Sequence, residues 1–296
     1  MAGANDVTVL WLADSSPRTD PSRRLNELVK RTVSALVAAP VAIAAVWFGS
    51  PWFEFLVGAM LVVGAFEWTR LCGLGLRTGA LPVWGTPLVI VLMSAFAEPA
   101  MALPVLLLGV AIGMLQGTRT NEQGSSFGWT GRWSAGGVAL LGTAGLAVMY
   151  LRIWVPDGAA TILWLFAVVW ASDIGAYFAG RTLGGPKLAP AISPGKTWSG
   201  LAGGLFVAMV VGGIGGYLKA DAISLAAIVV AFAVAGAAAA GDLLESFVKR
   251  RFGAKDSGSI MPGHGGVLDR IDGVLTAAPV LAIIAVLSAG NPITWQ

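Results

Sequence analysis

The chain has 296 residues, of which 56% are hydrophobic and 12% are charged, with a formal net charge of +3 at pH 7. Charged residues make up about 25% of an ordinary soluble domain, so the composition excludes that class and indicates a polytopic membrane protein. The positive charge does not indicate a nucleic-acid partner. Such binding needs Lys and Arg clustered on a water-exposed surface, and the apolar segments leave little of it.

Nine apolar segments are long enough, or nearly so, to cross a hydrocarbon core about 30 Å thick as helices. The fourth is the least regular, because it carries Pro104 near its start. We therefore expect an all-α polytopic integral membrane protein with about nine transmembrane helices. In chain order, the segments span approximately residues 32–50, 52–68, 80–97, 101–117, 135–152, 158–179, 199–217, 222–241 and 273–290.

We expect three regions along the chain. In residues 1–31 a short apolar run precedes the charges, the reverse of a secretory signal, so this region is expected to be a partly disordered cytoplasmic tail. Residues 32–152 form an N-terminal transmembrane region of about five spans with almost no ionisable motif. Residues 153–296 form a C-terminal transmembrane region of about four spans, in which a polar site faces the cytoplasm.

Basic residues alternate between loops as the positive-inside rule requires. With a cytoplasmic N-terminus, 17 of the 19 Lys and Arg residues fall on the inner side. Only Arg152 and Lys219 fall outside. We therefore expect the N-terminus in the cytoplasm and the C-terminus on the outer side of the membrane.

Cysteine and histidine each occur once, as Cys72 and His264. Any metal must therefore be held mainly by oxygen, which favours magnesium, manganese or calcium over zinc.

Small residues recur at every fourth position of the seventh segment and let another helix approach closely. That helix can belong to the same chain or to a second copy, so the pattern permits a homodimer. The stripe consists of Gly200, Gly204, Ala208, Gly212 and Gly216.

The first polar segment, residues 170–200, places ionisable groups near one membrane surface. Asp173, Tyr177 and Arg181 share one helical face at i, i+4 and i+8. A carboxylate inside a membrane helix is a functional candidate by default, although pairing with Arg181 would also explain it. The glycine- and proline-rich turn that follows suits phosphate oxygens or anionic lipid headgroups. Its candidate ligands are Lys187, Ser193, Lys196 and Thr197.

The second polar segment, residues 241–273, presents acids before bases. Carboxylates from two helices beside a glycine-rich loop and several cations suit metal-assisted phosphoryl or nucleotidyl transfer. Helix capping by the two later aspartates and topology signalling by the run of bases are the alternative interpretations. The segment contains Asp242, Glu245, Ser246, Lys249, Arg250, Arg251, Lys255, Asp256, His264, Gly265, Gly266, Asp269, Arg270 and Asp272.

The run from Ser246 to Asp272 resembles the signature of the phosphatidate cytidylyltransferase family, also called CDP-diacylglycerol synthases. The upstream SDIGAYFAGR and KLAPAISPGKTW resemble another block of that family, so the resemblance covers roughly residues 165–290. Gly273 and Ser199 depart from the pattern at its margins. The resemblance implies a magnesium-dependent reaction of CTP with phosphatidic acid, giving CDP-diacylglycerol and pyrophosphate, at the cytoplasmic face of the bacterial inner membrane.

The resemblance also implies roles for single residues, with CTP, phosphatidic acid and membrane lipids as partners. Asp242 and Asp269 are expected to hold Mg²⁺, with Asp173, Glu245 and Asp272 as further ligands and room for a second cation. The expected catalytic residues are Asp173, Asp242, Lys249, Arg250, Asp269 and Arg270. The expected substrate-binding residues are Arg181, Lys187, Ser193, Lys196, Thr197, Ser246, Lys255, Asp256, His264, Gly265 and Gly266.

Two other functions share some of these features. A cytidylyltransferase for another lipid phosphate would carry the same motifs, because apolar grooves read acyl chains without signature residues. A secondary transporter also places acids inside the membrane, but it predicts matching interruptions in two repeated halves. Here the charged motifs lie in the C-terminal half of the chain.

Overall fold

A computed structural model describes residues 36–75, 79–96, 101–116, 129–220, 224–258, 260 and 265–293. The expected tail, residues 1–31, and His264 lie outside these residues. Each of the nine predicted segments coincides with a helix. The helices are Leu36–Phe48, α2 (Trp52–Leu71), α3 (Leu81–Phe96), α4 (Ala102–Gln116), α5 (Trp129–Ile153), α6 (Gly158–Leu183), α7 (Trp198–Ala220), α8 (Leu225–Arg251) and α9 (Leu268–Ser288).

Six of the described helices, α2 and α5 to α9, are long and apolar enough to cross a membrane. Leu36–Phe48, α3 and α4 are apolar but shorter. The expectation of a polytopic all-α membrane protein is confirmed. The count of nine spans stays a prediction.

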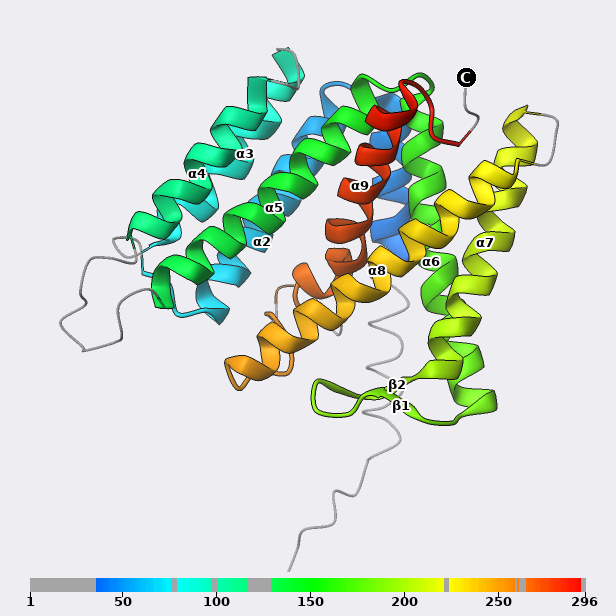
Figure 1. Ribbon diagram of the computed structural model, residues 1–296. Coiled ribbons are helices and arrows are strands. Elements are labelled where there is room, and N and C mark those ends of the chain that lie inside the picture. Colours follow the sequence, from blue (N-terminus) through cyan, green and yellow to red (C-terminus); the bar gives the residue numbers. More distant parts are fainter. Residues whose placement is uncertain are drawn as a thin grey trace, which may run out of the picture.

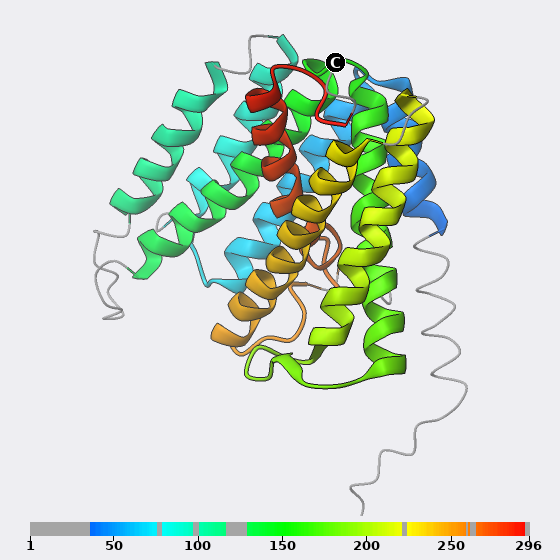
Figure 2. The ribbon, with the colours of Figure 1, turned by 45° about the vertical axis from the view of Figure 1, so that its right-hand side comes forward.

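The helix α9 occupies the middle of the bundle (Figures 1 and 2) and contacts α5 on one side and α8 on the other. The helices α3 and α4 pack on α5, whereas α6 and α7 pack on each other and on α8. Residues far apart in the sequence therefore meet around the first turns of α9.

Several helices extend beyond the predicted apolar segments. The helix α8 continues to Arg251, ten residues past the expected end, and α9 begins at Leu268 rather than at residue 273. Hydropathy falls where charged residues begin, but backbone hydrogen bonding does not. Basic side chains in the last turn of α8 and Asp269 in the first turn of α9 also suit the helix dipoles.

Aromatic side chains hold the end of α8 against α5. The ring of Phe252 lies 4.9 Å from that of Trp133 and 5.9 Å from that of Trp129. The guanidinium of Arg251 lies over the Trp129 ring at 4.6 Å, a favourable cation–π contact. These contacts fix the direction in which the last turns of α8 present their acids.

The glycine- and proline-rich turn between α6 and α7 is a short hairpin of β1 (Lys187–Ala189) and β2 (Ser193–Thr197). The strands are antiparallel, with Lys187 opposite Thr197. Thr197 caps α7, because its Oγ1 accepts the Gly200 N–H at 3.0 Å. The hairpin crosses the end of the bundle near the charged end of α8 (Figure 1).

The stripe of small residues on α7 is used inside the chain. A Cβ at Gly204 would collide with the α6 backbone at Ser172, and one at Gly212 would collide with Ala231 of α8. The indole of Trp164 donates a hydrogen bond to the Gly212 carbonyl at 3.0 Å. The stripe therefore brings α6 and α8 close to α7, which sets the width of the site described next.

Candidate functional site

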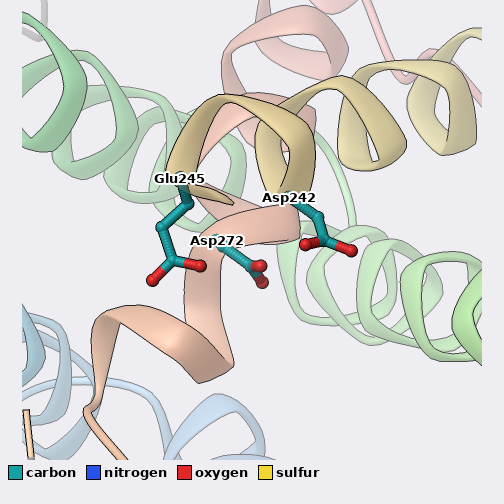
Figure 3. Close-up of side chains that lie close together, drawn as sticks. All are labelled: Asp242, Glu245 and Asp272. Carbon is teal, nitrogen blue, oxygen red and sulfur yellow. The ribbon is translucent and has the colours of Figure 1, made fainter. Parts of the chain in front are cut away.

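Three carboxylates from two helices gather near the start of α9. Asp242 and Glu245 lie three residues apart on one face of α8, and Asp272 faces them from the second turn of α9 (Figure 3). One oxygen of each lies within 4.8 Å of the others. Glu245 is buried, whereas the aspartates are half-buried. We call Asp242, Glu245 and Asp272 the acid cluster.

Lys249 connects the acid cluster to the first turn of α9. Its Nζ lies 2.8 Å from Oε2 of Glu245 and 2.6 Å from Oδ1 of Asp269. These side chains are only 12%, 8% and 9% exposed, respectively, so water screens the attraction weakly. The Lys249 ammonium thus forms ion pairs with two carboxylates at once.

Backbone N–H groups hold the second oxygen of Asp269. Its Oδ2 accepts the N–H groups of Gly266 at 2.8 Å and Ser257 at 3.0 Å. Gly265, just before, has φ +85°, and a Cβ there would lie 2.8 Å from the same oxygen, so only glycine fits comfortably. The structure therefore places Asp269 between Lys249 and the glycine-rich loop, beside the other predicted metal ligands.

A cavity of about 470 Å³ lies between α6, the hairpin, α7 and α8, and it joins the two polar segments. Asp173, Tyr177 and Arg181 line it from α6, as the shared helical face predicted. Lys196 and Asp242 line it from the other side, and Lys196 Nζ lies 2.5 Å from Asp242 Oδ2. The cavity is therefore a polar recess that borders the acid cluster through Asp242.

The remaining predicted residues lie around this centre. Arg250 donates hydrogen bonds to the carbonyls of Ile192 at 3.3 Å and Ala254 at 3.0 Å, and so ties the hairpin to the end of α8. Thr197 lines the cavity. Exposed side chains are those of Lys187, Lys255, Asp256 and Arg270, and half-buried ones are those of Ser193 and Ser246.

Sequence reasoning missed one buried carboxylate. Glu67 of α2 is 1% exposed. It accepts the N–H groups of Val267 at 3.0 Å and Leu268 at 2.8 Å, and the hydroxyl of Ser257 at 3.3 Å. The signal was present in the sequence, because a carboxylate inside an apolar span is the same feature that identified Asp173.

The acid cluster fits a hard divalent cation. Its donors are all oxygens, which magnesium, calcium and manganese prefer. Among the described residues, Glu245 Oε1 is buried without a hydrogen-bond partner, and such a group ordinarily finds one. Three carboxylates this close also repel one another unless positive charge offsets them. A cation bound there would give Glu245 Oε1 a partner and would offset the repulsion among the three carboxylates.

Comparison with known sequences decides the family. Residues 29–288 match the profile of the Cytidylyltransferase family. The chain belongs to this family. The match begins well before residue 165, so it covers more of the chain than the motifs that carry the resemblance.

Curated cytidylyltransferase relatives align over most of their own length. A phosphatidate cytidylyltransferase of Brucella suis is 37% identical over 276 residues, covering 90% of this chain and 96% of the relative. One from Pseudomonas aeruginosa is 35% identical over 263 residues, covering 87% and 96%. One from Haemophilus influenzae is 31% identical over 290 residues, covering 85% and 96%.

Proposed function

We propose that the protein transfers CMP from CTP to phosphatidic acid, giving CDP-diacylglycerol and pyrophosphate. The observation that carries the proposal is the meeting of both polar segments of a cytidylyltransferase-family chain at one recess beside the acid cluster. Cations for phosphate groups and carboxylates for a metal ion are thereby available at one end of the bundle.

The reaction needs no covalent enzyme intermediate. An oxygen of the lipid phosphate attacks the α-phosphorus of CTP, a new P–O bond forms, and the bond from that phosphorus to the bridging oxygen of the β-phosphate breaks. Pyrophosphate leaves with the electron pair of the broken bond. The attacking phosphate is already an anion at neutral pH, so the site requires no strong general base.

The chain's own residues would orient the two phosphates and offset their charge. Lys196 and Arg181 line the recess and would bind phosphate oxygens there. Lys249 would act mainly by holding Glu245 and Asp269 in place, because its ammonium is already shared between them. Asp173 would support Asp242 from the opposite wall of the recess.

Magnesium is the proposed cofactor, held by Asp242, Glu245 and Asp272. When bound, it would supply positive charge to phosphate oxygens as negative charge develops on them. Of the five predicted ligands, these three group most closely. We propose Asp269 as a residue that orients Lys249 and the loop.

We also propose that all nine helices cross the inner membrane, with the N-terminus and the site on the cytoplasmic side and the C-terminus outside. The two basic residues on the opposite side have local partners that support this topology. Lys219 lies 2.9 Å from Asp157, and Arg152 donates hydrogen bonds to the Val46 carbonyl.

We propose the same three regions along the chain as the sequence predicts, residues 1–31, 32–152 and 153–296. A homodimer would need a face other than the stripe on α7, which α6 and α8 occupy.

Pyrophosphate release by the purified full-length protein in detergent tests the proposal. With CTP, phosphatidic acid and Mg²⁺ present, we expect release together with CDP-diacylglycerol, and none when any one is omitted. Activity only with a different lipid phosphate would retain the chemistry and change the substrate. Silence with every lipid phosphate in a folded sample would refute nucleotidyl transfer.

A further inference from the structure

The buried Glu67 connects the N-terminal helices to the start of α9. Its Oε1 accepts the Val267 N–H, and its Oε2 accepts the Leu268 N–H and the Ser257 hydroxyl. These donors lie 190 to 201 residues away in the sequence. A carboxylate at the N-terminus of a helix is stabilised by the free amides and by the helix dipole.

Glu67 and Asp269 share the consecutive backbone N–H groups at the start of α9. The N–H of Gly266 points to Asp269, and the next two, from Val267 and Leu268, point to Glu67. Ser257 contacts both carboxylates, Asp269 through its N–H and Glu67 through its hydroxyl. The chain around these residues is therefore clamped between two carboxylates, one of which also holds Lys249.

Two glycines leave room for the Glu67 carboxylate and for nothing larger. A Cβ at Gly258 would lie 2.5 Å from Glu67 Oε1. A Cβ at Gly266 would lie 2.6 Å from Glu67 Oε2 and would collide with the Ser257 hydroxyl. The two glycines and the three donors fit the shape and hydrogen-bonding groups of a carboxylate. An apolar side chain of similar size would fill the same space but could not accept these hydrogen bonds.

We propose that Glu67 is a positioning residue for the nucleotidyl transfer proposed above. It fixes Ser257 and the first turn of α9, these groups orient Asp269, and Asp269 together with Glu245 holds Lys249 at the acid cluster. The N-terminal helices thus contribute to the geometry of the site through one side chain. This inference rests on the proposed function.

Substitution of Glu67 by Gln isolates the hydrogen bonding, because the two side chains have nearly the same shape. One carboxylate oxygen becomes an NH₂ group, which would face a backbone N–H as a second donor. The matched control is Glu54→Gln. Glu54 lies on the same helix, thirteen residues earlier, which is about 20 Å along the axis.

The experiment measures kcat and KM of the full-length protein in detergent by pyrophosphate release, and the Mg²⁺ concentration that half-maximally raises the unfolding temperature. For Glu67→Gln we expect kcat to fall by about 10–100-fold, and the Mg²⁺ requirement to rise by a factor in the same range. KM for phosphatidic acid should stay unchanged, because the recess is not altered. Glu54→Gln should behave as wild type.

Ser257→Ala is the second variant, for the case that Glu67→Gln does not fold. It removes only the hydroxyl contact, so a smaller fall in kcat is expected, and no further fall when it is combined with Glu67→Gln.

The inference would be overturned if Glu67→Gln had the kcat and the Mg²⁺ requirement of the wild type. It would also be overturned if its loss of activity only followed the folded fraction. If Glu67→Gln does not fold, unchanged kinetics of Ser257→Ala would overturn it. No pyrophosphate release by the wild type would count against the proposed function, and the Mg²⁺ titration would then decide the role of Glu67.

Discussion

Replacing Lys249 by Met tests whether this side chain holds the site together. The substitution keeps the apolar stem and removes the ammonium that lies 2.8 Å from Glu245 and 2.6 Å from Asp269. Both carboxylates are less than a tenth exposed, so each would lose the buried cation that offsets its charge. Breaking a buried pair in this way costs about 3–5 kcal/mol, and we expect that loss in the free energy of unfolding.

Lys196→Met provides the matched control. Lys196 lies even closer to its partner, 2.5 Å from Asp242, but the two side chains are 25% and 38% exposed. Solvent reaches this half-buried pair and screens it, so its contribution should approach that of a surface pair, about 1 kcal/mol or less. Distance alone would rank the two variants in the wrong order, so the comparison tests burial as the cause.

Unfolding of the purified variants by SDS in mixed micelles, followed by tryptophan fluorescence, gives the free energies. Adding Glu245→Gln to Lys249→Met should restore part of the stability, because one of the two orphaned charges is removed. Equal losses for Lys249→Met and Lys196→Met would refute the reasoning. So would a double variant that is no more stable than Lys249→Met.

Three other outcomes follow from the structure. Burial raises the pKa of the Cys72 thiol to about 12, so little thiolate exists at pH 8, and maleimide labelling should be slow until SDS unfolds the protein. Gly203→Ala should cost about 1–3 kcal/mol of unfolding free energy, because its Cβ would collide with Ala179 of α6; Gly236→Ala, which has open space, should be neutral or stabilising. Chelation of divalent cations should lower the unfolding temperature of the wild type, but not that of the acid-cluster variant Asp272→Asn.

Much of the helical fold could be predicted from the sequence because long apolar runs in lipid have few alternatives to a helix. The ends of the helices could not, since α8 continues for ten residues beyond its apolar core, six of them polar or charged. The hairpin was also missed. Glycine and proline in residues 184–195 indicate a turn, but pairing of Lys187 with Thr197 depends on a register that periodicity does not reveal.

The candidate site was predicted as a set of residues but not as an arrangement. Asp242 and Glu245 lie three residues apart, which implies a shared helical face. This spacing could not show that Asp272 would face them while Asp269 lies against Lys249. Contacts between helices depend on crossing geometry, which a single sequence does not fix. Glu67 stands alone in an apolar segment and its partners lie about two hundred residues away, so no local cluster of charge marks it in the sequence.

The distance in sequence between Glu67 and α9 bears on how the protein is made. The ribosome adds 200 residues between Glu67 and Val267, which takes about 10–40 s at roughly 5–20 residues per second. During this interval α2 carries a carboxylate whose three eventual donors have not been synthesised. The packing of α2 around Glu67 is therefore completed late in biogenesis, only after α9 has been synthesised and has joined the bundle.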